Sequence, residues 1–348
     1  MTSKSPWFFQ GLSAEVKAGV RALFQAAVRW AQVIKNKDGK DKFAYKINVF
    51  AMRANDWEAT NMDASTTSED ETQNWAGYDA VNRYGDEVLT GGNDYSTSSP
   101  QNYPALGRIY RTGYEEKDIV DYNTNNLKTN LGLYYMLSDK IELSYNFNFS
   151  TGTTVYQGDN RYSLKDIKFF QNRLEIKQND KFFVRFYATN EDAGKTYDAV
   201  VTAFEMSEAS KPEGVFYQNY AQYYTGIKDR IFAAGMPTND ENKPNLAQII
   251  SECGCSFEEA QQIFAQQFLV WQADTRAMQN DWAYGAGADS MAVFSDESRA
   301  AAENLVAGGG ENPYYRPGTA RYDSLLNVVT TDLLSEGGSR LYDKSALY

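Results

Sequence analysis

The segment KIELSYNFNFSTGTTVYQG, residues 140–158, alternates between apolar and polar side chains over an unusual length. One face of an extended chain would carry Ile141, Leu143, Tyr145, Phe147 and Phe149. The other face would carry Lys140, Glu142, Ser144, Asn146, Asn148 and Ser150. A period of two is typical of a β-strand. Strands of soluble proteins usually have about five or six residues, whereas this pattern runs for roughly twice that length, which is close to the span of a transmembrane strand.

The same alternation recurs along the first half of the chain. It is found within residues 12–20, 23–32, 42–51, 126–137, 181–188 and, less regularly, 169–177, where Asn172 interrupts the apolar face. Outside 169–177 no position on these apolar faces is charged, although 23% of the chain is charged. A lysine or arginine on a lipid-facing position costs about 2–4 kcal/mol at mid-membrane. A soluble sheet has a weaker reason to exclude every charge, so the pattern favours strands that face lipid.

The connections differ between the two ends of the predicted strands. Tight turns join consecutive strands at one end, at residues 36–40 (NKDGK), 138–139 and 178–180 (QND). At the other end, residues 54–124 form one long polar segment, and the short join QGDN at 157–160 also belongs to this side. Short turns on one rim and long loops on the other are typical of outer-membrane barrels.

The second half of the chain reads as helices and loops. From about residue 195 onward no further strand is clear, and three segments predict helices: residues 214–235, 258–278 and 295–306. Gly235 would end the first helix, and Ser256 with Glu259 would form a capping box at the start of the second. More than a hundred residues without a strand exceed an ordinary connection, so this part is predicted to be an insertion with its own packing.

The predicted fold class is an all-β membrane barrel fragment of about seven antiparallel strands with a mainly helical, long extracellular loop insertion. Residues 1–206 would form the antiparallel transmembrane segment, including the long extracellular loop 54–124. Residues 207–348 would form a helix-rich extracellular loop region. Seven strands cannot close a barrel that hides its edges, so we expect the chain to be part of a larger barrel.

Composition excludes several classes of function. The net charge of −12 argues against binding to nucleic acid. The chain contains no histidine, so a Ser-His-Asp or Cys-His catalytic site is excluded, and we predict no catalytic residue, no metal and no cofactor. Cys253 and Cys255 are two residues apart, and we expect them to be incidental free thiols. The acidic run SEDE, residues 68–71, lacks the spaced ligands of a calcium loop. Residues 1–10 do not have the pattern of a secretory leader.

Several motifs together resemble one family. They are SPWFFQGLSAEVKAG (5–19), VRWAQVIKNKDGKDKFAYKINVFAMRANDWEATN (28–61), RTGYEEKDIVDYNTNNLKTNLGLYY (111–135), NFSTGTTVYQGDNRYSLKDIK (148–168), KFFVRFYATNEDAGKTYD (181–198) and GGSRLYDKSALY (337–348). In this order they resemble the start of the barrel in TonB-dependent outer-membrane receptors of Bacteroidetes-type bacteria. The last motif resembles the stretch that ends a large external loop, just before the next strand.

The resemblance implies a function and partners. Members of this family have a barrel of about 22 strands that a globular plug domain fills, and the TonB complex energises their uptake of scarce nutrients. The expected location is the outer membrane of a Gram-negative bacterium, with outer-membrane lipid, the plug, the TonB complex and a surface lipoprotein as candidate partners. The plug, the segment on which TonB pulls and the later strands are expected to lie outside this chain.

The polar faces of the strands are the first candidate site. In an intact receptor of this family they would face the plug, and the residues assigned to this role are Lys46, Asn48, Glu142, Asn146, Asn148 and Arg185. The second candidate site is the long loop, where residues 73–87 and 91–104 mix aromatic rings with amides and hydroxyls. Such a mixture can stack on and hydrogen-bond to sugars or peptides. The residues predicted to contact an unidentified ligand are Trp75, Tyr78, Tyr84, Asn93, Tyr95 and Tyr103.

Two other classes remain as alternatives to the transporter. The first is a surface-binding or adhesion protein in which the barrel is passive. The second is a soluble, secreted β-rich binding domain with a helical cap, for which the alternating faces would be ordinary sheet packing. Solubility without detergent would favour the second alternative.

Overall fold

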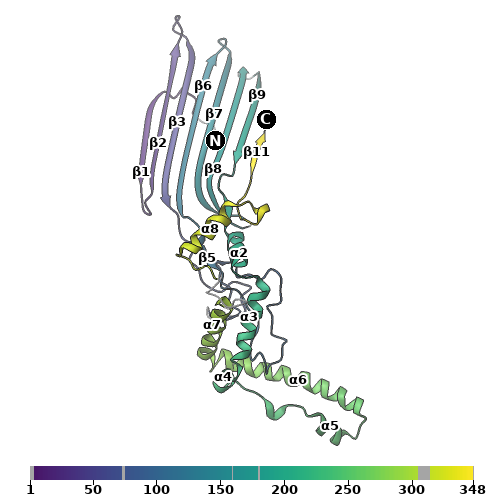
Figure 1. Ribbon diagram of the computed structural model, residues 1–348. Coiled ribbons are helices and arrows are strands. Elements are labelled where there is room, and N and C mark those ends of the chain that lie inside the picture. The colour runs from purple at the N-terminus through teal and green to yellow at the C-terminus, as the bar shows by residue number, and fades with distance from the viewer. Residues whose placement is uncertain (1–3, 73–74, 159, 179–180, 305–313, 348) are drawn as a thin grey trace. The chain divides into compact units, whose positions relative to one another are not determined.

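The structure is a computed structural model that describes residues 4–72, 75–158, 160–178, 181–304 and 314–347. The chain forms two compact units (Figure 1). Unit 1 contains residues 1–60, 116–205 and 320–348, and unit 2 contains residues 61–115 and 206–319. Each unit is described by itself. No helix within the described residues is long and apolar enough to cross a membrane.

Unit 1 is built on a single antiparallel sheet whose strands lie side by side (Figure 1). Its spatial order is β1 (Gly11–Ala18), β2 (Phe24–Lys35), β3 (Asp41–Asn55), β6 (Asn123–Met136), β7 (Ile141–Gln157), β8 (Arg161–Gln178), β9 (Phe182–Asp192) and β11 (Lys344–Leu347). The short strand β10 (Tyr197–Asp198) also pairs with β8. The prediction of about seven long antiparallel strands is confirmed. Within the described residues the sheet stays open, with β1 at one edge and β9 covered by β11 only over Thr189–Asp192.

The strand register keeps the apolar residues of the alternating pattern on one face. Trp30 of β2 lies opposite Ile47 of β3, Ile47 lies opposite Leu131 of β6, and Leu131 lies opposite Phe147 of β7. A shift of one residue in any pair would turn its apolar residues to the polar face, so the alternating pattern itself fixes this register.

One strand is longer than the sequence pattern predicts. β8 begins at Arg161, whereas the alternation is clear only from residue 169. Its pairing with β7 shifts register between Gly152 and Thr154, and Asp166 has a left-handed backbone with φ of 55°. A bulge adds a residue to one strand and changes which residues share a face, so a strict period of two fails across it.

The tight turns on one rim agree with the prediction where they are described. In the turn at residues 36–40 the backbone N–H of Asn36 donates to the carbonyl of Lys40 (2.8 Å), and Gly39 has a φ of +77°. Ser138 and Asp139 join β6 to β7. Of the third predicted turn, Asn179 and Asp180 lie outside the described residues, as does Asp159 of the join at 157–160.

Small helices of unit 1 lie in the segments that continue from the other rim. They are α1 (Glu116–Ile119), the first half of α2 (Ala199–Ser210), α8 (Ala320–Thr331) and the short 3-10 helix η2 (Leu334–Glu336). The Thr202 hydroxyl of α2 donates to Ser339 Oγ (2.7 Å), and the Tyr322 hydroxyl of α8 donates to the carbonyl of Asp118 (2.6 Å). These bonds bring the end of the chain back to the sheet, where β11 pairs with β9.

The two compact units do not follow the predicted boundary between residues 206 and 207. Residues 61–115 of the long loop belong to unit 2 with residues 206–319, and residues 320–348 belong to unit 1. The loop carries many aromatic side chains that it cannot bury alone, and helices from the second half of the chain cover them. The hydrophobic gain from this burial is the reason why the loop packs with the later helices.

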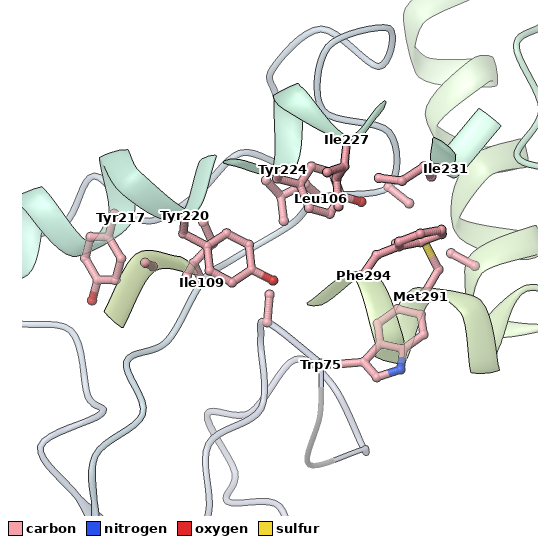
Figure 2. Close-up of a cluster of buried hydrophobic side chains, with 14 of the residues drawn as sticks. Trp75, Leu106, Ile109, Tyr217, Tyr220, Tyr224, Ile227, Ile231, Met291 and Phe294 are labelled. Carbon is pink, nitrogen blue, oxygen red and sulfur yellow. The ribbon is translucent and has the colours of Figure 1, made fainter. Parts of the chain in front are cut away.

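Unit 2 contains helices and a long irregular segment. Its elements are β4 (Arg83–Tyr84), β5 (Tyr114–Glu115), the second half of α2, α3 (Glu213–Gly226), α4 (Lys228–Ala233), η1 (Asp240–Asn242), α5 (Leu246–Cys253), α6 (Phe257–Tyr284) and α7 (Ala288–Asn304). Figure 2 shows Trp75, Leu106 and Ile109 of the irregular segment in a common hydrophobic core with side chains of α3 and α7. The core also buries phenols, and each finds a partner: Tyr224 donates to the carbonyl of Pro104 (2.6 Å).

The predicted helices are present with changed ends. The capping box of Ser256 and Glu259 is confirmed at the start of α6. The helix predicted over 214–235 is two helices, α3 and α4, which meet at Ile227. Residue 306, the last of the third predicted helix, lies outside the described residues, and so does the Gly-rich stretch that follows it.

The prediction of two free thiols is wrong. Cys253 and Cys255 form a disulfide, with their Cα atoms 5.1 Å apart. Gly254 between them has a left-handed φ of +60°, which reverses the chain after α5 and brings the two Cα atoms into the usual range for a disulfide.

The disulfide leads to a direct chemical prediction. The unreduced protein, denatured in guanidinium chloride, is expected to show no reaction with a chromogenic thiol reagent, because the chain contains two Cys and both are bonded. After reduction the same assay is expected to find two thiols per chain. Two reactive thiols before reduction would contradict the disulfide.

Candidate functional site

The apolar face of the sheet is exposed at its outer strands and half-buried along β7. Leu12 of β1 is 72% exposed and Phe186 of β9 is 65% exposed, and smaller exposed fractions are found for Ile47 and Val49 of β3. Ala26 and Ile34 of β2, at the two ends of the apolar band, are eight residues apart. At a rise of ~3.4 Å per residue the band is therefore about 27 Å long.

Charged residues occur on the same face at one end of this band or beyond it. Arg53 of β3 lies opposite Phe24, and Lys168 of β8 lies opposite Thr151 and Asp192. These three residues, and Lys344 of β11 opposite Asp192, lie toward the rim of the long loops. The apolar band is thus bounded by charge on one side and by the tight turns on the other.

The opposite face carries a row of polar side chains that crosses the sheet. The register aligns Arg29 of β2, Asn48 of β3, Asn130 of β6, Asn148 of β7 and Gln171 of β8. Asn48 Nδ2 donates to Asn130 Oδ1 (2.7 Å), and Asn130 Nδ2 donates to Asn148 Oδ1 (2.7 Å). We call this set of five residues the amide row. The hydrogen bonds between Asn48, Asn130 and Asn148 satisfy polar side chains in the middle of the face. These three residues lie on neighbouring strands, and none of them is charged.

Ion pairs on this polar face link β7, β8 and β9. Glu142 of β7 lies opposite Lys177 of β8, and their charged atoms are 3.1 Å apart. Glu175 of β8 lies opposite Arg185 of β9 and accepts a hydrogen bond from its Nε. Opposite charges directly across two strands stabilise the pairing.

The N-terminal segment crosses the polar face ahead of β1. The indole Nε1 of Trp7 donates to the carboxylate of Glu142 (2.6 Å), and Arg29 donates to the carbonyl of Phe9 (2.6 Å). Pro6 is buried. Residues 4–9 therefore lie on the polar face and not on the apolar face.

Two hollows are present on the polar face. The smaller has a volume of about 510 Å³ and is lined by the amide row together with Phe50 and Lys128. The larger has a volume of about 1280 Å³ and is lined by Trp7, Tyr134, Asn146 and Arg173, among others. The polar face can therefore accommodate other groups in addition to the N-terminal segment.

The register places all six residues predicted to face the plug on this one polar face. They are Lys46, Asn48, Glu142, Asn146, Asn148 and Arg185. Lys46, Glu142 and Asn146 are buried, and Arg185 is exposed. Their role toward a plug stays a prediction. The sequence did not predict Gln171 and Arg173 as part of this face, because they belong to the irregular segment 169–177. It did not predict Trp7, because this residue precedes the first strand.

The structure does not gather the predicted loop residues into an exposed surface. Trp75, Tyr78, Tyr84 and Asn93 are buried, and only Tyr95 and Tyr103 are half-buried. The ring of Trp75 stacks on that of Tyr284 with centroids 4.4 Å apart. Asn93 Nδ2 donates to the carbonyl of Ile109 (3.0 Å). These side chains already have partners within unit 2, and their contact with a ligand stays a prediction.

The acidic run at residues 68–71 also has partners in the protein. Asp70 accepts hydrogen bonds from the backbone N–H of Gly77 (2.5 Å) and from the hydroxyl of Tyr284 (2.6 Å), and burial raises its pKa. Glu69 forms an ion pair with Arg108 (3.1 Å). Within the part of the chain that the structure describes, no group of three or more Cys, Asp and Glu side chains could hold a metal ion.

Asp86 is the most strongly perturbed acid outside the sheet. Its side chain is fully buried, and burial raises its pKa from 3.8 to about 7, although Arg83 pairs with it (2.6 Å). The negative charges of Asp79 and Glu87 add to this shift. Among the described residues its Oδ1 has no hydrogen-bond partner.

This raised pKa predicts how the stability of the protein depends on pH. The folded state holds the proton more tightly than the unfolded state, so Asp86 contributes stability that is complete below pH 3.8 and is lost as the pH rises through about 7. A shift of about three pKa units corresponds to roughly 4 kcal/mol at most. In Asp86→Asn, urea denaturation between pH 4 and 8 should show a smaller loss of unfolding free energy. Some slope should remain because burial also raises the pKa of Glu87. A slope equal to that of the wild type would contradict this assignment.

Comparison of the chain with known protein families, with curated proteins and with solved structures finds no match. The functional conclusion therefore depends on the sheet, its two contrasting faces and the motifs of the sequence.

Proposed function

We propose that the sheet of unit 1 is part of the wall of a membrane-spanning β-barrel, in an outer-membrane receptor of the TonB-dependent class. The observation that carries this proposal is the exposed apolar band, which is about 27 Å long and crosses β2, β3, β6 and β7 without a charge. Outer-membrane barrels have an outward apolar band about 25 Å tall.

The size of the band argues for lipid as its partner. Soluble monomers rarely expose a continuous apolar patch larger than a few hundred Å². Here the apolar band extends across the sheet from Leu12 in β1 to Phe186 in β9, with charged residues only toward the rim of the long loops. Hydrocarbon accepts such a surface only if the backbone groups of every strand are paired. The edges at β1 and β9 would then pair with further strands of a closed barrel.

The polar face fits the inside of a filled barrel. An open aqueous pore needs no hydrogen bonds between its wall residues, whereas Asn48, Asn130 and Asn148 of the amide row are bonded side chain to side chain. The N-terminal segment already lies on this face, where Trp7 donates to Glu142. A barrel wall that binds a polypeptide segment on its inner side is more typical of a receptor with a plug domain than of an open porin.

The two rims support a direction for the sheet in the membrane. The described turns at residues 36–40 and 138–139 are short, and the segments that form unit 2 all leave from the opposite rim. Outer-membrane barrels have short periplasmic turns and longer extracellular loops. Unit 2 would therefore lie outside the cell, with its own core, and contribute to ligand recognition and energised uptake of a nutrient.

The membrane proposal is tested by labelling single cysteines. Both native Cys are in a disulfide, so an introduced Cys is the only free thiol. Val49→Cys and Asn48→Cys, adjacent on β3, are labelled with an environment-sensitive dye in the full chain bound to vesicles, and Leu131→Cys with Asn130→Cys repeats the pair on β6. We expect brominated lipid to quench the dye at Val49 and Leu131 and not at Asn48 and Asn130. Equal quenching within both pairs, or a chain that stays monodisperse in buffer and ignores vesicles, would refute it.

The uptake part of the proposal needs a separate measurement. Strains that lack this gene and strains that lack the TonB complex are grown on a panel of scarce nutrients. A TonB-dependent receptor predicts that both strains fail on the same nutrient. Loss of surface attachment without loss of growth would instead favour the adhesion class.

A further inference from the structure

One end of the polar face carries hydrogen-bond donors that have no acceptor. Among the described residues, Asn146 Nδ2 and Arg173 Nε are buried without a hydrogen-bond partner. The two residues lie directly opposite each other on β7 and β8, and both line the larger hollow. Asn146 is only 7% exposed. A buried donor without an acceptor costs free energy of the order of 1–3 kcal/mol, so two neighbouring ones need an explanation.

The neighbours of Asn146 fix which of its side-chain atoms is the donor. The ammonium of Lys46 donates to the hydroxyl of Tyr134 (3.4 Å), and that hydroxyl donates to Asn146 Oδ1 (3.0 Å). Tyr134 is held in place because its ring lies over Gly132, where a Cβ atom would come within 2.8 Å of the ring. Because Tyr134 uses its proton on Oδ1, Nδ2 of Asn146 is left to face a further acceptor.

Arginine and lysine side chains lie around this position, together with the carboxylates of Glu142 and Glu175, which both act electrostatically on Tyr134 and already have partners. Arg29 and Arg173 both act electrostatically on Lys46, which is itself buried. Among the described residues no carboxylate pairs with Arg173. Like charges that are close together and partly desolvated repel one another. A negative group between them would relieve this repulsion and accept hydrogen bonds from the free donors.

The carboxylates nearby are already engaged. Glu142 accepts from Trp7 and pairs with Lys177, and Asp139 pairs with Lys40 (2.7 Å). Asp41, which also lines the larger hollow, is exposed at the end of β3. The negative group is therefore expected to come from outside the described residues.

We propose that Asn146 and Arg173, in the positive field of Lys46, form a binding site for an oxyanion, that is, a carboxylate or phosphate group carried by a small solute in the larger hollow. Arg173 offers Nε and Nη donors in a planar fork, which suits two oxygens of one carboxylate or phosphate. Asn146 supplies a third donor from the neighbouring strand. The volume of about 1280 Å³ leaves room for a solute much larger than the anion itself. This site goes beyond the proposed uptake function and does not depend on where the apolar face lies.

The test measures anion binding to the full chain in detergent micelles. Inorganic phosphate and citrate are titrated by calorimetry at constant ionic strength, with chloride as the reference anion. We expect the wild type to bind phosphate or citrate at least tenfold more tightly than chloride, and the tighter of the two shows whether the site prefers a phosphate or a carboxylate. Arg173→Gln should weaken this binding at least tenfold. The matched control is Lys128→Gln, which removes one positive charge from the same face at the smaller hollow, and it should change the affinity less than twofold.

A second variant keeps the result clear if Arg173→Gln does not fold. Asn146→Asp has nearly the same shape, and its carboxylate would occupy the place of the anion between Lys46 and Arg173. It should raise the melting temperature and abolish the binding of phosphate and citrate. The proposal fails if the wild type prefers neither anion to chloride, if Lys128→Gln weakens binding as much as Arg173→Gln, or if Asn146→Asp lowers the melting temperature and still binds the anions.

Discussion

Replacing Ile47 by lysine is expected to prevent most of the protein from inserting into lipid vesicles. Ile47 is in the middle of the apolar band, opposite Trp30 on one side and Leu131 on the other. A lysine near the middle of a bilayer costs about 2–4 kcal/mol, and 1.4 kcal/mol is a factor of ten in an equilibrium constant. The ratio of inserted to free protein should therefore fall roughly 30- to 800-fold. Vesicle flotation of the refolded chain measures this ratio.

The control places the same new side chain on the other face at nearly the same depth. Gln171 is exposed on the polar face, next in sequence to Asn172, which lies in the same cross-strand row as Ile47. Gln171→Lys should insert as the wild type does, because its ammonium would point into the hollows and not into lipid. If the two variants insert equally well, the apolar band does not face hydrocarbon and the barrel proposal fails.

Replacing Arg276 by methionine is expected to unfold much of unit 2. The guanidinium of Arg276 on α6 donates to four backbone carbonyls of the irregular segment, those of Tyr95 (3.2 Å), Ser98 (2.7 Å), Tyr103 (2.9 Å) and Leu106 (3.0 Å). A hydrogen bond from a charged donor contributes about 1.5–3 kcal/mol, and a buried carbonyl left without a donor carries a further cost. We expect a loss of about 3–5 kcal/mol in unfolding free energy.

The loss of unfolding free energy is measured by urea denaturation followed by near-UV circular dichroism. This signal reports on unit 2 because Trp75, Trp271 and Trp282 all belong to it. Arg276→Lys should recover only part of the stability, because an ammonium cannot reach four carbonyls that a planar guanidinium reaches. The matched control is Arg230→Met in α4, whose guanidinium pairs with Glu297 (2.8 Å) at the surface and should leave the midpoint nearly unchanged. Equal midpoints for Arg276→Met and Arg230→Met would show that Arg276 does not hold the segment.

The sequence by itself determined the strands and their two faces. The alternation of apolar and polar side chains is a local property. Each regularly alternating segment therefore predicts a strand and shows which of its two faces is apolar. Residues such as Ile47 and Asn48 could therefore be assigned to opposite faces without any knowledge of the neighbouring strands. The capping box at Ser256 could be recognised for the same reason, since its two residues are only three positions apart.

Features that depend on register or on distant segments could not be predicted. The amide row forms because the pairing of β3 with β6 and of β6 with β7 aligns Asn48, Asn130 and Asn148, and no short window of sequence contains that information. The burial of Trp75 depends on Tyr284, which is more than two hundred residues later, so its place in a core could not be read from the loop alone. The disulfide depends on the left-handed turn at Gly254.

The division follows from the range of the interactions. The sequence alone shows which face of each strand favours contact with water and which favours apolar surroundings. It does so because hydration acts on each side chain separately. Only the tertiary structure decides which polar groups meet on that side. At the larger hollow it placed Asn146 opposite Arg173, within the field of Lys46, and among the described residues it left two donors without an acceptor, because hydrogen bonds between different strands require specific distances.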